Sequence, residues 1–592
     1  MNRPRLAVGA VVLATCLMAI FLPAGYVTNL IYVGLASIVT MGLVLLIGVG
    51  GMTSFGQAAF VGTGAYASAY VTTRYGLPAP AGLLASVAAT GIAASLLGLL
   101  TMRLKAWYLP LGTLACGLAI YYYFGTAEML RGHTGFGNIP PLSVGPLSLI
   151  DERSSAIAVW IVSGLCTVLM INLLDSRTGR AMRTLRGRVV MGEAFGLNTA
   201  WLRFRLFVLS ALLASVSGWL YVHIVRFVNP SPFSLTASMD YLFMAVVGGA
   251  GSIWGAFLGA LILVTSRQWL VETLPQLIGT QASYEMVVFG LTLILLLQRT
   301  RNGLVPFVQR CFPKTRTAEV PDTAAPPLAR LDTGPAPVLS VRGVSKSFGG
   351  LKAVSDLDFE VRTGEVVGLI GPNGAGKSTL FNVVTGVLPA DGGEILFAGR
   401  RLERLPSRAM VRLGLARTFQ HVQLRSDLSC GDNVAIGAHI RTRSGMLRSM
   451  LRLDRAEENS VSAEAQRQLA RVGLSEEYHV PAGELSLGQQ RLVEIARALA
   501  ADPRILMLDE PAAGLRHQEK QALAALLNSL RGEGRGILIV EHDMEFLMSI
   551  ADRVVVMVSG AKLTEGAPAG VQRDPRVIEA YLGAEPEAQL VS

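Results

Sequence analysis

The chain has 592 residues, of which 51% are hydrophobic and 16% charged, and its mean hydropathy is +0.46. A wholly soluble chain rarely reaches these values, so we expect part of it to lie in a membrane. Lys and Arg exceed Asp and Glu, 52 against 42. They form no long tract with interleaved aromatics, which favours the positive-inside bias of membrane proteins and argues against nucleic acid as a partner. Five scattered cysteines without a C-x-x-C pair indicate neither a disulfide framework nor a zinc site.

Nine apolar runs fill the first 298 residues. A helix needs about 20 apolar residues to cross the hydrocarbon core of a membrane, and most of the runs qualify. They span residues 6–24, 26–50, 55–73, 79–102, 107–124, 156–174, 204–225, 241–264 and 284–297. The first run, preceded by Arg3 and Arg5, also resembles a secretory signal, but no small-x-small cleavage site follows it, so we expect a retained helix.

The charges between the runs predict orientation and number of crossings. Six arginines lie between residues 175 and 203 and further basic residues follow residue 297, so both segments are expected in the cytoplasm and the loop 126–155 outside. With the N-terminus also inside, the number of crossings must be even. The segment 233–269, which includes the run 241–264, contains the glycine break GGAGS (248–252). Two shorter, tilted helices can meet at this break. We therefore expect ten transmembrane helices, with eight as the alternative.

Glycine and alanine recur in the stretch GGMTSFGQAAFVGTGAYASAY (50–70). Small residues let helices approach closely, and Ser54 and Gln57 can hydrogen-bond across such an interface. The stretch is interpreted either as a tight helix interface or as the lining of a translocation path.

The composition changes sharply after residue 298. Residues 299–337 are rich in Pro, Ala and Thr and lack an apolar period, which is typical of a linker. From residue 338 onward, apolar strands alternate with helices. The sequence thus predicts a polytopic α-helical membrane domain at 1–298, a Pro/Ala-rich cytoplasmic linker at 299–337 and a soluble α/β domain at 338–592.

A nucleotide-binding motif, G-x-x-x-x-G-K-[ST], follows the apolar strand EVVGLIG. Its glycines let backbone N–H groups and a helix N-terminus face the phosphates, its lysine reaches the β and γ oxygens, and its serine holds Mg²⁺. Taken alone, the motif indicates an NTP site and little more. The residues expected at the nucleotide are Gly371, Asn373, Gly374, Gly376, Lys377, Ser378 and Thr379.

Further candidate residues follow the motif along the chain. Asp509 and Glu510 end the buried strand RILMLDE, where Asp509 can hold magnesium and Glu510 can orient or deprotonate the attacking water. His542 follows another apolar strand and can contact a γ-phosphate. Gln420, in RTFQH, offers an amide that can ligate magnesium or water. The metal ligands expected are therefore Ser378, Asp509 and Gln420.

The turn LSLGQQ, with Ser486, Gly488 and Gln489, precedes a helix and provides a second anion-binding end. Together with the preceding motifs it resembles the ABC-type ATPases, from residue 338 to about residue 583. The resemblance implies an α/β P-loop fold, ATP and Mg²⁺ as ligands, and Phe348 stacked on adenine. In that family the nucleotide lies between two ATPase domains, so the LSLGQQ residues would contact the ATP held by a partner.

The sequence departs from the common ABC pattern at two places, and the second departure sharpens the resemblance. Leu487 stands where many members have glycine, and PAAGLRH (511–517) lacks the aspartate that many members carry there. PAAGL and the closing DPRVIEAYLG are similar to the subfamily for hydrophobic amino-acid uptake, although Arg516-His517 replaces its more usual Asn-Pro.

Segments of the membrane half resemble the permeases of branched-chain amino-acid importers. They are GQAAFVGTGAY (56–66), GGAGSIWGAFLGA (248–260) and GRAMRTLRGRVVMGEAFGLN (179–198). Residues 190–197, with Glu193, Ala194 and Gly196, are expected to form a short coupling helix that docks on an ATPase domain near Gln420. A solvated positive-inside loop is the alternative.

The resemblance implies ATP-driven uptake of branched-chain or other hydrophobic amino acids across the bacterial inner membrane. It implies an extracytoplasmic solute-binding protein and a heteromer with a second permease and a second ATPase, and a homodimer of this fusion is the alternative. Importers of amides, urea or carboxylates are further alternatives, because no residue of the membrane half specifies the solute. An ABC exporter fits less well, since exporters usually have six long helices. An ATPase merely tethered to a membrane would not need so many glycine-rich crossings.

Overall fold

The computed structural model describes residues 3–101, 108–144, 147–278 and 339–582, together with short stretches between 290 and 330. The chain divides into two compact units. The helical unit holds Met1–Asp175, Leu185–Gly187 and Ala200–Thr317, and the α/β unit holds Ser176–Thr184, Arg188–Thr199 and Ala318–Ser592. Two segments between the sixth and ninth helices therefore group with the α/β unit. The predicted boundaries at residues 298 and 337 lie at or among residues largely outside the described part and stay predictions.

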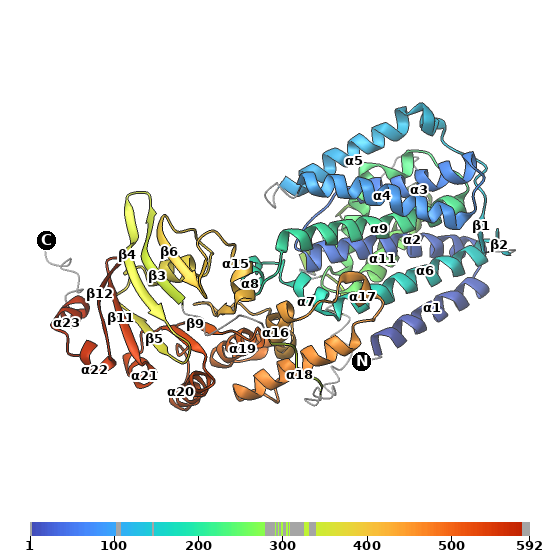
Figure 1. The fold of residues 1–592 in the computed structure, drawn as a ribbon. Helices are drawn as coiled ribbons and strands as arrows, with labels where there is room; N and C mark the ends of the chain where they lie inside the picture. Colours follow the sequence, from blue (N-terminus) through green and yellow to red (C-terminus); the bar gives the residue numbers. More distant parts are fainter. Residues whose placement is uncertain are drawn as a thin grey trace. The chain divides into compact units, whose positions relative to one another are not determined.

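The described part of the helical unit contains nine helices of 14 or more residues (Figure 1). Six of them, α1, α2, α4, α6, α9 and α11, are long and apolar enough to cross a membrane. The predicted run 284–297 lies mostly outside the described residues, so the number of crossings stays a prediction. The nine helices are α1 (Arg3–Phe21), α2 (Ala24–Val44), α3 (Gln57–Arg74), α4 (Ala79–Thr101), α5 (Leu109–Thr126), α6 (Glu152–Leu174), α9 (Thr199–Val225), α10 (Leu235–Gly248) and α11 (Ile253–Ile278).

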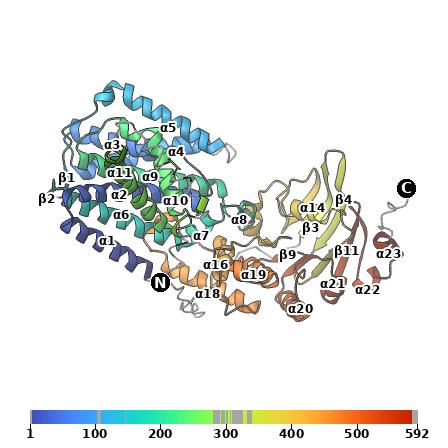
Figure 2. The ribbon, with the colours of Figure 1, turned by 180° about the vertical axis from the view of Figure 1, so that it is seen from behind.

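Helix α2 forms the core of the helical unit. It is buried from Val33 onward, continues as a π-helical turn at Leu45–Val49, and packs against α6, α10 and α11. Figure 2 shows α2 between these neighbours from behind. The loop between α5 and α6 holds 3-10 turns at Glu128–Leu130 and Gly132–Thr134 and an antiparallel pair, β1 (Leu142–Val144) and β2 (Leu147–Leu149).

The predicted helix break is confirmed. α10 ends at Gly248, Gly249 adopts a φ of 108° that glycine tolerates, and α11 begins at Ile253. A Cβ added at Gly259 of α11 would lie 1.9 Å from Met244 O of α10, so the two helices pack with almost no space between their backbones. Close packing thus explains the glycines of this segment.

The polar residues of the stretch 50–70 differ in what they contact. Gln57 Nε2 donates to Ser210 Oγ on α9 over 3.1 Å, as predicted for a bond across a helix interface. Ser54 instead accepts locally from the N–H of Gly56. The tight-interface interpretation therefore holds for Gln57, whereas Ser54 stabilises the turn that leads into α3.

The α/β unit contains two sheets. The six-stranded sheet has the order β12-β11-β5-β10-β9-β8, parallel except for β12, and the four-stranded antiparallel sheet has the order β4-β3-β6-β7. The strands are β3 (Leu339–Phe348), β4 (Leu351–Val361), β5 (Val366–Ile370), β6 (Gly392–Phe397), β7 (Arg400–Arg401), β8 (Leu415–Arg417), β9 (Ile505–Asp509), β10 (Gly536–Val540), β11 (Arg553–Val558) and β12 (Ala561–Gly566).

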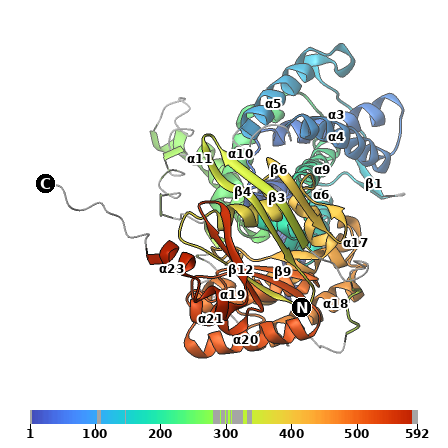
Figure 3. The ribbon, with the colours of Figure 1, turned by 60° about the vertical axis from the view of Figure 1, so that its left-hand side comes forward.

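Alternate residues of the parallel strands enter two cores, because side chains of a strand point to opposite faces. Val366 and Ile370 of β5 share a core with helices α16, α18, α19, α20 and α21, whereas Val367 and Leu369 face α14 and the four-stranded sheet. Figure 3 shows α19, α20 and α21 together on one side of the strands. The helices of this unit are α7 (Arg177–Arg183), α8 (Val189–Ala194), α14 (Lys377–Val384), α15 (Ser407–Met410), α16 (Cys430–Gly437), α17 (Met446–Met450), α18 (Arg455–Arg471), α19 (Leu487–Ala500), α20 (His517–Gly532), α21 (Met544–Ile550), α22 (Pro568–Val571) and α23 (Pro575–Leu582).

Candidate functional site

Four adjacent parallel strands end at one edge of the six-stranded sheet, and each leads into predicted site residues. The Gly371–Thr379 loop follows β5, His542 follows β10, Glu510 follows β9, and Gln420 follows β8. In such sheets ligands bind outside the carboxyl ends of the strands. The topology therefore brings together residues that are up to about 170 positions apart in the chain.

The phosphate-binding loop has the backbone that its glycines predict. Gly374 and Gly376 adopt φ values of 82° and 96°, and a Cβ at Gly376 would lie 2.1 Å from Ala353 O. Asn373, Gly374 and Ser378 are exposed, Thr379 is half-buried, and α14 begins at Lys377. Exposed N–H groups at a helix start suit a phosphate.

Lys377 is folded back onto its own loop. Its Nζ donates to Gly371 O over 2.6 Å and to Pro372 O over 3.0 Å. Burial lowers the pKa of Lys377, while the nearby carboxylates of Glu510 and Asp509 oppose this shift. The ammonium thus stands between the loop and the two carboxylates that end β9.

Glu510 is the centre of a side-chain cluster. Gln420 Nε2 donates to Glu510 Oε1 over 3.2 Å, and His542 Nε2 lies 3.1 Å from the same oxygen. The backbone of Glu510 is left-handed, with a φ of 51°, which is uncommon for a residue other than glycine. Its N–H donates to Val540 O and its carbonyl accepts from Arg491 Nη1, and these two bonds hold this conformation.

Asp509 is buried one residue earlier. Its N–H donates to Thr418 Oγ1 over 3.2 Å. Burial raises the pKa of Asp509, and the guanidinium of Arg417 opposes this shift. A carboxylate in this position can serve as a ligand of a hard cation.

The sequence patterns did not predict two residues of the site, Glu541 and Arg491. Glu541, next to His542, accepts from the N–H of Ala512 over 2.6 Å and from that of His542 over 3.0 Å, so it ties the end of β10 to the segment after Glu510. Burial raises the pKa of Glu541. Its place directly after the apolar strand β10 is the local signal for this residue. Arg491 gave no local signal, because its contact with Glu510 bridges 19 residues.

The predicted signature turn lies at the start of α19. Ser486 caps this helix by accepting from the N–H of Gln489, and the Gln489 side chain returns a bond to the N–H of Ser486. Leu487 is 56% exposed and Gly488 lies against Leu515. Within the described residues no hydrogen bond or ion pair joins this turn to the Gly371–Thr379 loop, so the two predicted halves of the nucleotide site are not brought together in one chain.

Phe348 lies at the end of β3. Its ring is 49% exposed, and Lys346 Nζ stands 5.6 Å from the ring centroid. An exposed aromatic face of this kind can stack on a base, as predicted.

The short helix predicted within residues 190–197 is found as α8 (Val189–Ala194), and it packs in the α/β unit, while its coupling role stays a prediction. Phe195, just after α8, is buried and lies beneath the guanidinium of Arg497 at 4.8 Å. Arg188 donates to Gln423, three residues from Gln420. A Cβ at Gly196 would lie 2.4 Å from Ile440, so the small residue permits close contact. The solvated-loop alternative is therefore excluded for this segment.

A second contact by α7 was not predicted. Arg180 Nη2 donates to Glu458 Oε2 over 2.6 Å, and Arg177 donates to the carbonyls of His439 and Ser444, each over 2.8 Å. Two consecutive helices of the basic loop thus contact the rest of the α/β unit in different ways. The Phe195 ring after α8 packs under a guanidinium, whereas α7 forms an ion pair through Arg180.

Three family models match successive parts of the chain. Residues 25–297 match the branched-chain amino acid transport system permease component, residues 354–513 match the ABC transporter family, and residues 561–587 match the branched-chain amino acid ATP-binding cassette transporter model. The order of the matches is that of a membrane permease followed by an ABC-type ATPase.

Proteins similar to the ATPase part are ATP-binding proteins of branched-chain amino acid transport. The high-affinity branched-chain amino acid transport ATP-binding protein LivG of Salmonella typhimurium and that of Escherichia coli K12 are each 42% identical over 250 residues, which is 42% of this chain and 98% of theirs. BraF of Pseudomonas aeruginosa PAO1 gives the same identity and coverage. The chain belongs to the branched-chain amino acid ABC transporter family, with a permease and an ATP-hydrolysing domain fused in one polypeptide.

Proposed function

We propose that this chain is the permease and ATPase of an importer that takes branched-chain amino acids across the bacterial inner membrane. The observation that carries the proposal is that one α/β unit contains both the Glu510 cluster and the docked segments α7 and α8 of the permease loop. The site that hydrolyses ATP and the loop that connects membrane helices α6 and α9 are therefore packed into one structural unit.

The residues of the site fit ATP with Mg²⁺. The N–H groups of the Gly371–Thr379 loop suit phosphates, and the Phe348 ring suits adenine. The oxygen donors Ser378, Asp509 and Gln420 suit magnesium, which prefers hard oxygen ligands. Bound there, the metal would neutralise phosphate charge.

We assign the hydrolytic roles from the contacts of Glu510. Its carboxylate accepts a proton from the attacking water as general base, while Gln420 and His542 hold its Oε1 in place. Lys377 exchanges its bonds to Gly371 O and Pro372 O for phosphate oxygens.

Movement of the ATPase passes to the membrane through a chain of contacts. Glu494 accepts from the N–H of Gln423 and from Arg497, and Arg497 covers Phe195. Since Gln423 lies three residues from Gln420, a shift of the Gln420 segment displaces α8. Closure of two ATPase domains on ATP then biases the permease between two conformations.

The chain supplies one permease and one ATPase, and an importer of this family works with partner ABC subunits and a solute-binding protein. We infer a heteromer with a second permease and a second ATPase, whose signature turn completes the site at Lys377. Purification of the tagged full chain from its native membrane, with mass spectrometry of its partners, tests this assembly. Recovery of a second permease, a second ATPase and a solute-binding protein is expected, whereas two copies of this chain alone would contradict the heteromer.

A further inference from the structure

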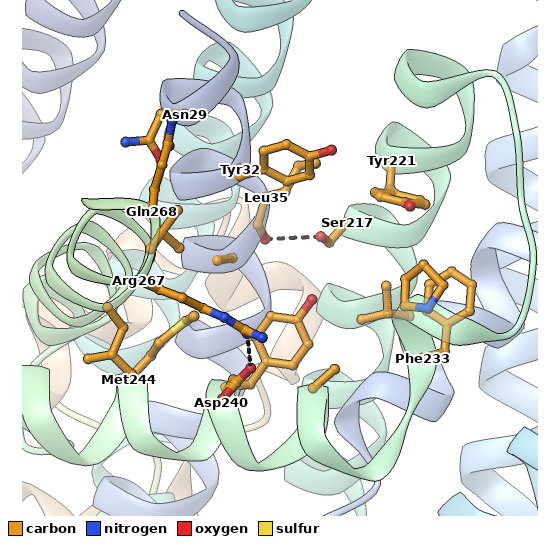
Figure 4. A pocket seen from close by; sticks show the side chains of 17 residues that line it. Asn29, Tyr32, Leu35, Ser217, Tyr221, Phe233, Asp240, Met244, Arg267 and Gln268 are labelled. Atoms are coloured by element: carbon orange, nitrogen blue, oxygen red, sulfur yellow. Dashed lines mark hydrogen bonds and ion pairs between the residues drawn. The ribbon is translucent and has the colours of Figure 1, made fainter. Parts of the chain in front are cut away.

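A cavity of about 400 Å³ lies among α2, α3, α9, α10, α11 and the 3-10 turn Ser231–Phe233 of the helical unit (Figure 4). Its volume is within the range of small-molecule sites in proteins, roughly 300–1,000 Å³. Most of the wall is apolar, with Leu35, Phe233, Met244 and Leu263 among the lining residues.

The cavity contains an ion pair. Arg267 Nη1 of α11 donates to Asp240 Oδ2 of α10 over 2.8 Å, and these two are the charged residues among its described lining. Figure 4 shows the Arg267 side chain reaching across to Asp240. The side chains keep 55% and 22% of their exposure, so a ligand in the cavity can reach both. Charged residues inside membrane helices are costly and mark substrate pathways.

The helices that carry the pair do not form a simple span. α10 has 14 residues, about 21 Å at 1.5 Å per residue, which is shorter than the roughly 30 Å hydrocarbon core. The chain turns at Gly249, and a Cβ at Gly48 would lie 1.6 Å from Ala250 O, so the turn is packed against the end of α2. Broken helices inside a membrane protein are where transporters place their substrate sites.

The lining of the cavity also contains a hydrogen-bond acceptor that has no donor among the described residues. Asn29 Oδ1 is buried and has no hydrogen-bond partner among the described residues. Tyr32, Tyr221 and Gln268 add further polar tips to the same lining. A buried polar atom without a partner is costly unless a ligand or water completes it.

We propose that this cavity binds the zwitterion of an apolar α-amino acid, with Asp240 facing its ammonium, Arg267 facing its carboxylate and the apolar wall holding its side chain. The inference rests on the proposed function and gives that function a site in the membrane half. Without ligand the two protein charges neutralise each other, and a zwitterion supplies one opposite charge to each. A ligand with a single charge leaves one protein charge without a partner, so the cavity selects against it.

Three ligands with one apolar skeleton test the charge requirement. They are L-leucine, 4-methylpentanoate, which lacks the ammonium, and isopentylamine, which lacks the carboxylate. The full chain in lipid nanodiscs is expected to bind radiolabelled leucine, and either single-charge analogue should compete about 10–100-fold more weakly, the factor that corresponds to losing one charged hydrogen bond.

Charge-removing variants test each side of the site. The Asp240→Asn variant no longer needs an ammonium, so 4-methylpentanoate should compete with radiolabelled leucine as well as unlabelled leucine does. The Arg267→Gln variant no longer needs a carboxylate, so isopentylamine should compete equally well there. The double variant Asp240→Asn/Arg267→Gln leaves no unpaired charge, so it keeps the fold even where a single variant fails, and it should lose leucine binding. Ser266→Ala, a neighbour on α11 outside the lining, should behave as wild type.

Three results overturn the inference. They are absence of leucine binding by the wild-type chain, unchanged leucine binding in the double variant, and a retained phospholipid that leucine does not displace. Measuring leucine uptake by the complete importer distinguishes failure of the cavity proposal from failure of the proposed function. Uptake that survives in the double variant refutes the cavity alone, whereas a wild-type importer without uptake refutes the function.

Discussion

Arg180 of α7 and Glu458 of α18 form an ion pair in which Nη2 donates to Oε2 over 2.6 Å, with 7% and 17% of the two side chains exposed. Burial alone would lower the pKa of Arg180, but Glu458 and Asp432 together raise it above its ordinary value. The pair joins the loop between two membrane helices to the ATPase. We propose that this pair helps to couple the loop to the ATPase.

Glu458→Ala should uncouple the two activities. Removing one partner of a buried pair costs at most about 3–5 kcal/mol, and here Asp432, 3.9 Å from Arg180 Nη1, still compensates part of the remaining charge. We expect basal ATPase activity to persist while its stimulation by leucine and the solute-binding protein falls. Glu476→Ala, at an exposed glutamate, is the matched control. In a double-mutant cycle with Arg180→Ala, strictly additive effects would argue against the pair.

Lys377→Ala should weaken nucleotide binding itself. Loss of a charged hydrogen bond costs about 1.5–3 kcal/mol, or roughly 10–100-fold in affinity. Equilibrium binding of a fluorescent ATP analogue to the full chain measures this. Unchanged affinity would remove Lys377 from the phosphate site.

Glu510→Gln should bind ATP normally and hydrolyse it about 10²–10⁴-fold more slowly, because the carboxylate acts on water and not on the nucleotide. Gln420 and His542 can still orient the amide. Steady-state phosphate release and ATP binding, measured on the same preparation, separate the two effects. The exposed Glu545→Gln serves as control, and normal turnover by Glu510→Gln would show that another group is the base.

The contact at α7 should also depend on pH. Burial lowers the pKa of His439 well below its ordinary value, and Arg177 and Arg180 lower it further. The imidazole is therefore neutral in the folded state at pH values where the unfolded chain is protonated. Below about pH 6.5 the unfolded state binds one more proton, so this residue reduces the free energy of unfolding by up to about 1.4 kcal/mol per pH unit.

His439→Gln should remove that part of the pH dependence while its amide oxygen accepts from Arg177. Thermal unfolding of the wild type and the variant between pH 7.5 and 5.5 measures the difference. Parallel curves for the two proteins would exclude a role for His439.

Local sequence patterns predicted much of this molecule. The glycine-rich loop, the strand that ends at Asp509, the break at Gly249 and the docking segment 190–197 are each written in a few consecutive residues, whose spacing reflects backbone geometry. The turn predicted before a helix at Ser486 is also found, and there serine and a glutamine three residues later form a capping box that was not predicted.

Pairs distant in the chain escaped prediction. Arg180 and Glu458 are 278 residues apart, and neither residue differs locally from other charges on an amphipathic helix. Asp240 and Arg267 flank the predicted apolar run 241–264, and hydropathy gives no sign that two charges 27 residues apart form a pair. Such pairs arise from tertiary packing, which periodicity does not encode.

We propose that hydrolysis at Glu510 drives amino-acid uptake through the permease of the same chain. The most direct test is ATP-dependent accumulation of radiolabelled L-leucine in proteoliposomes that contain the purified complex and its solute-binding protein. Accumulation is predicted for the wild type with ATP and not for Glu510→Gln. Equal accumulation by the two proteins, or hydrolysis without accumulation by the wild type, would contradict the account.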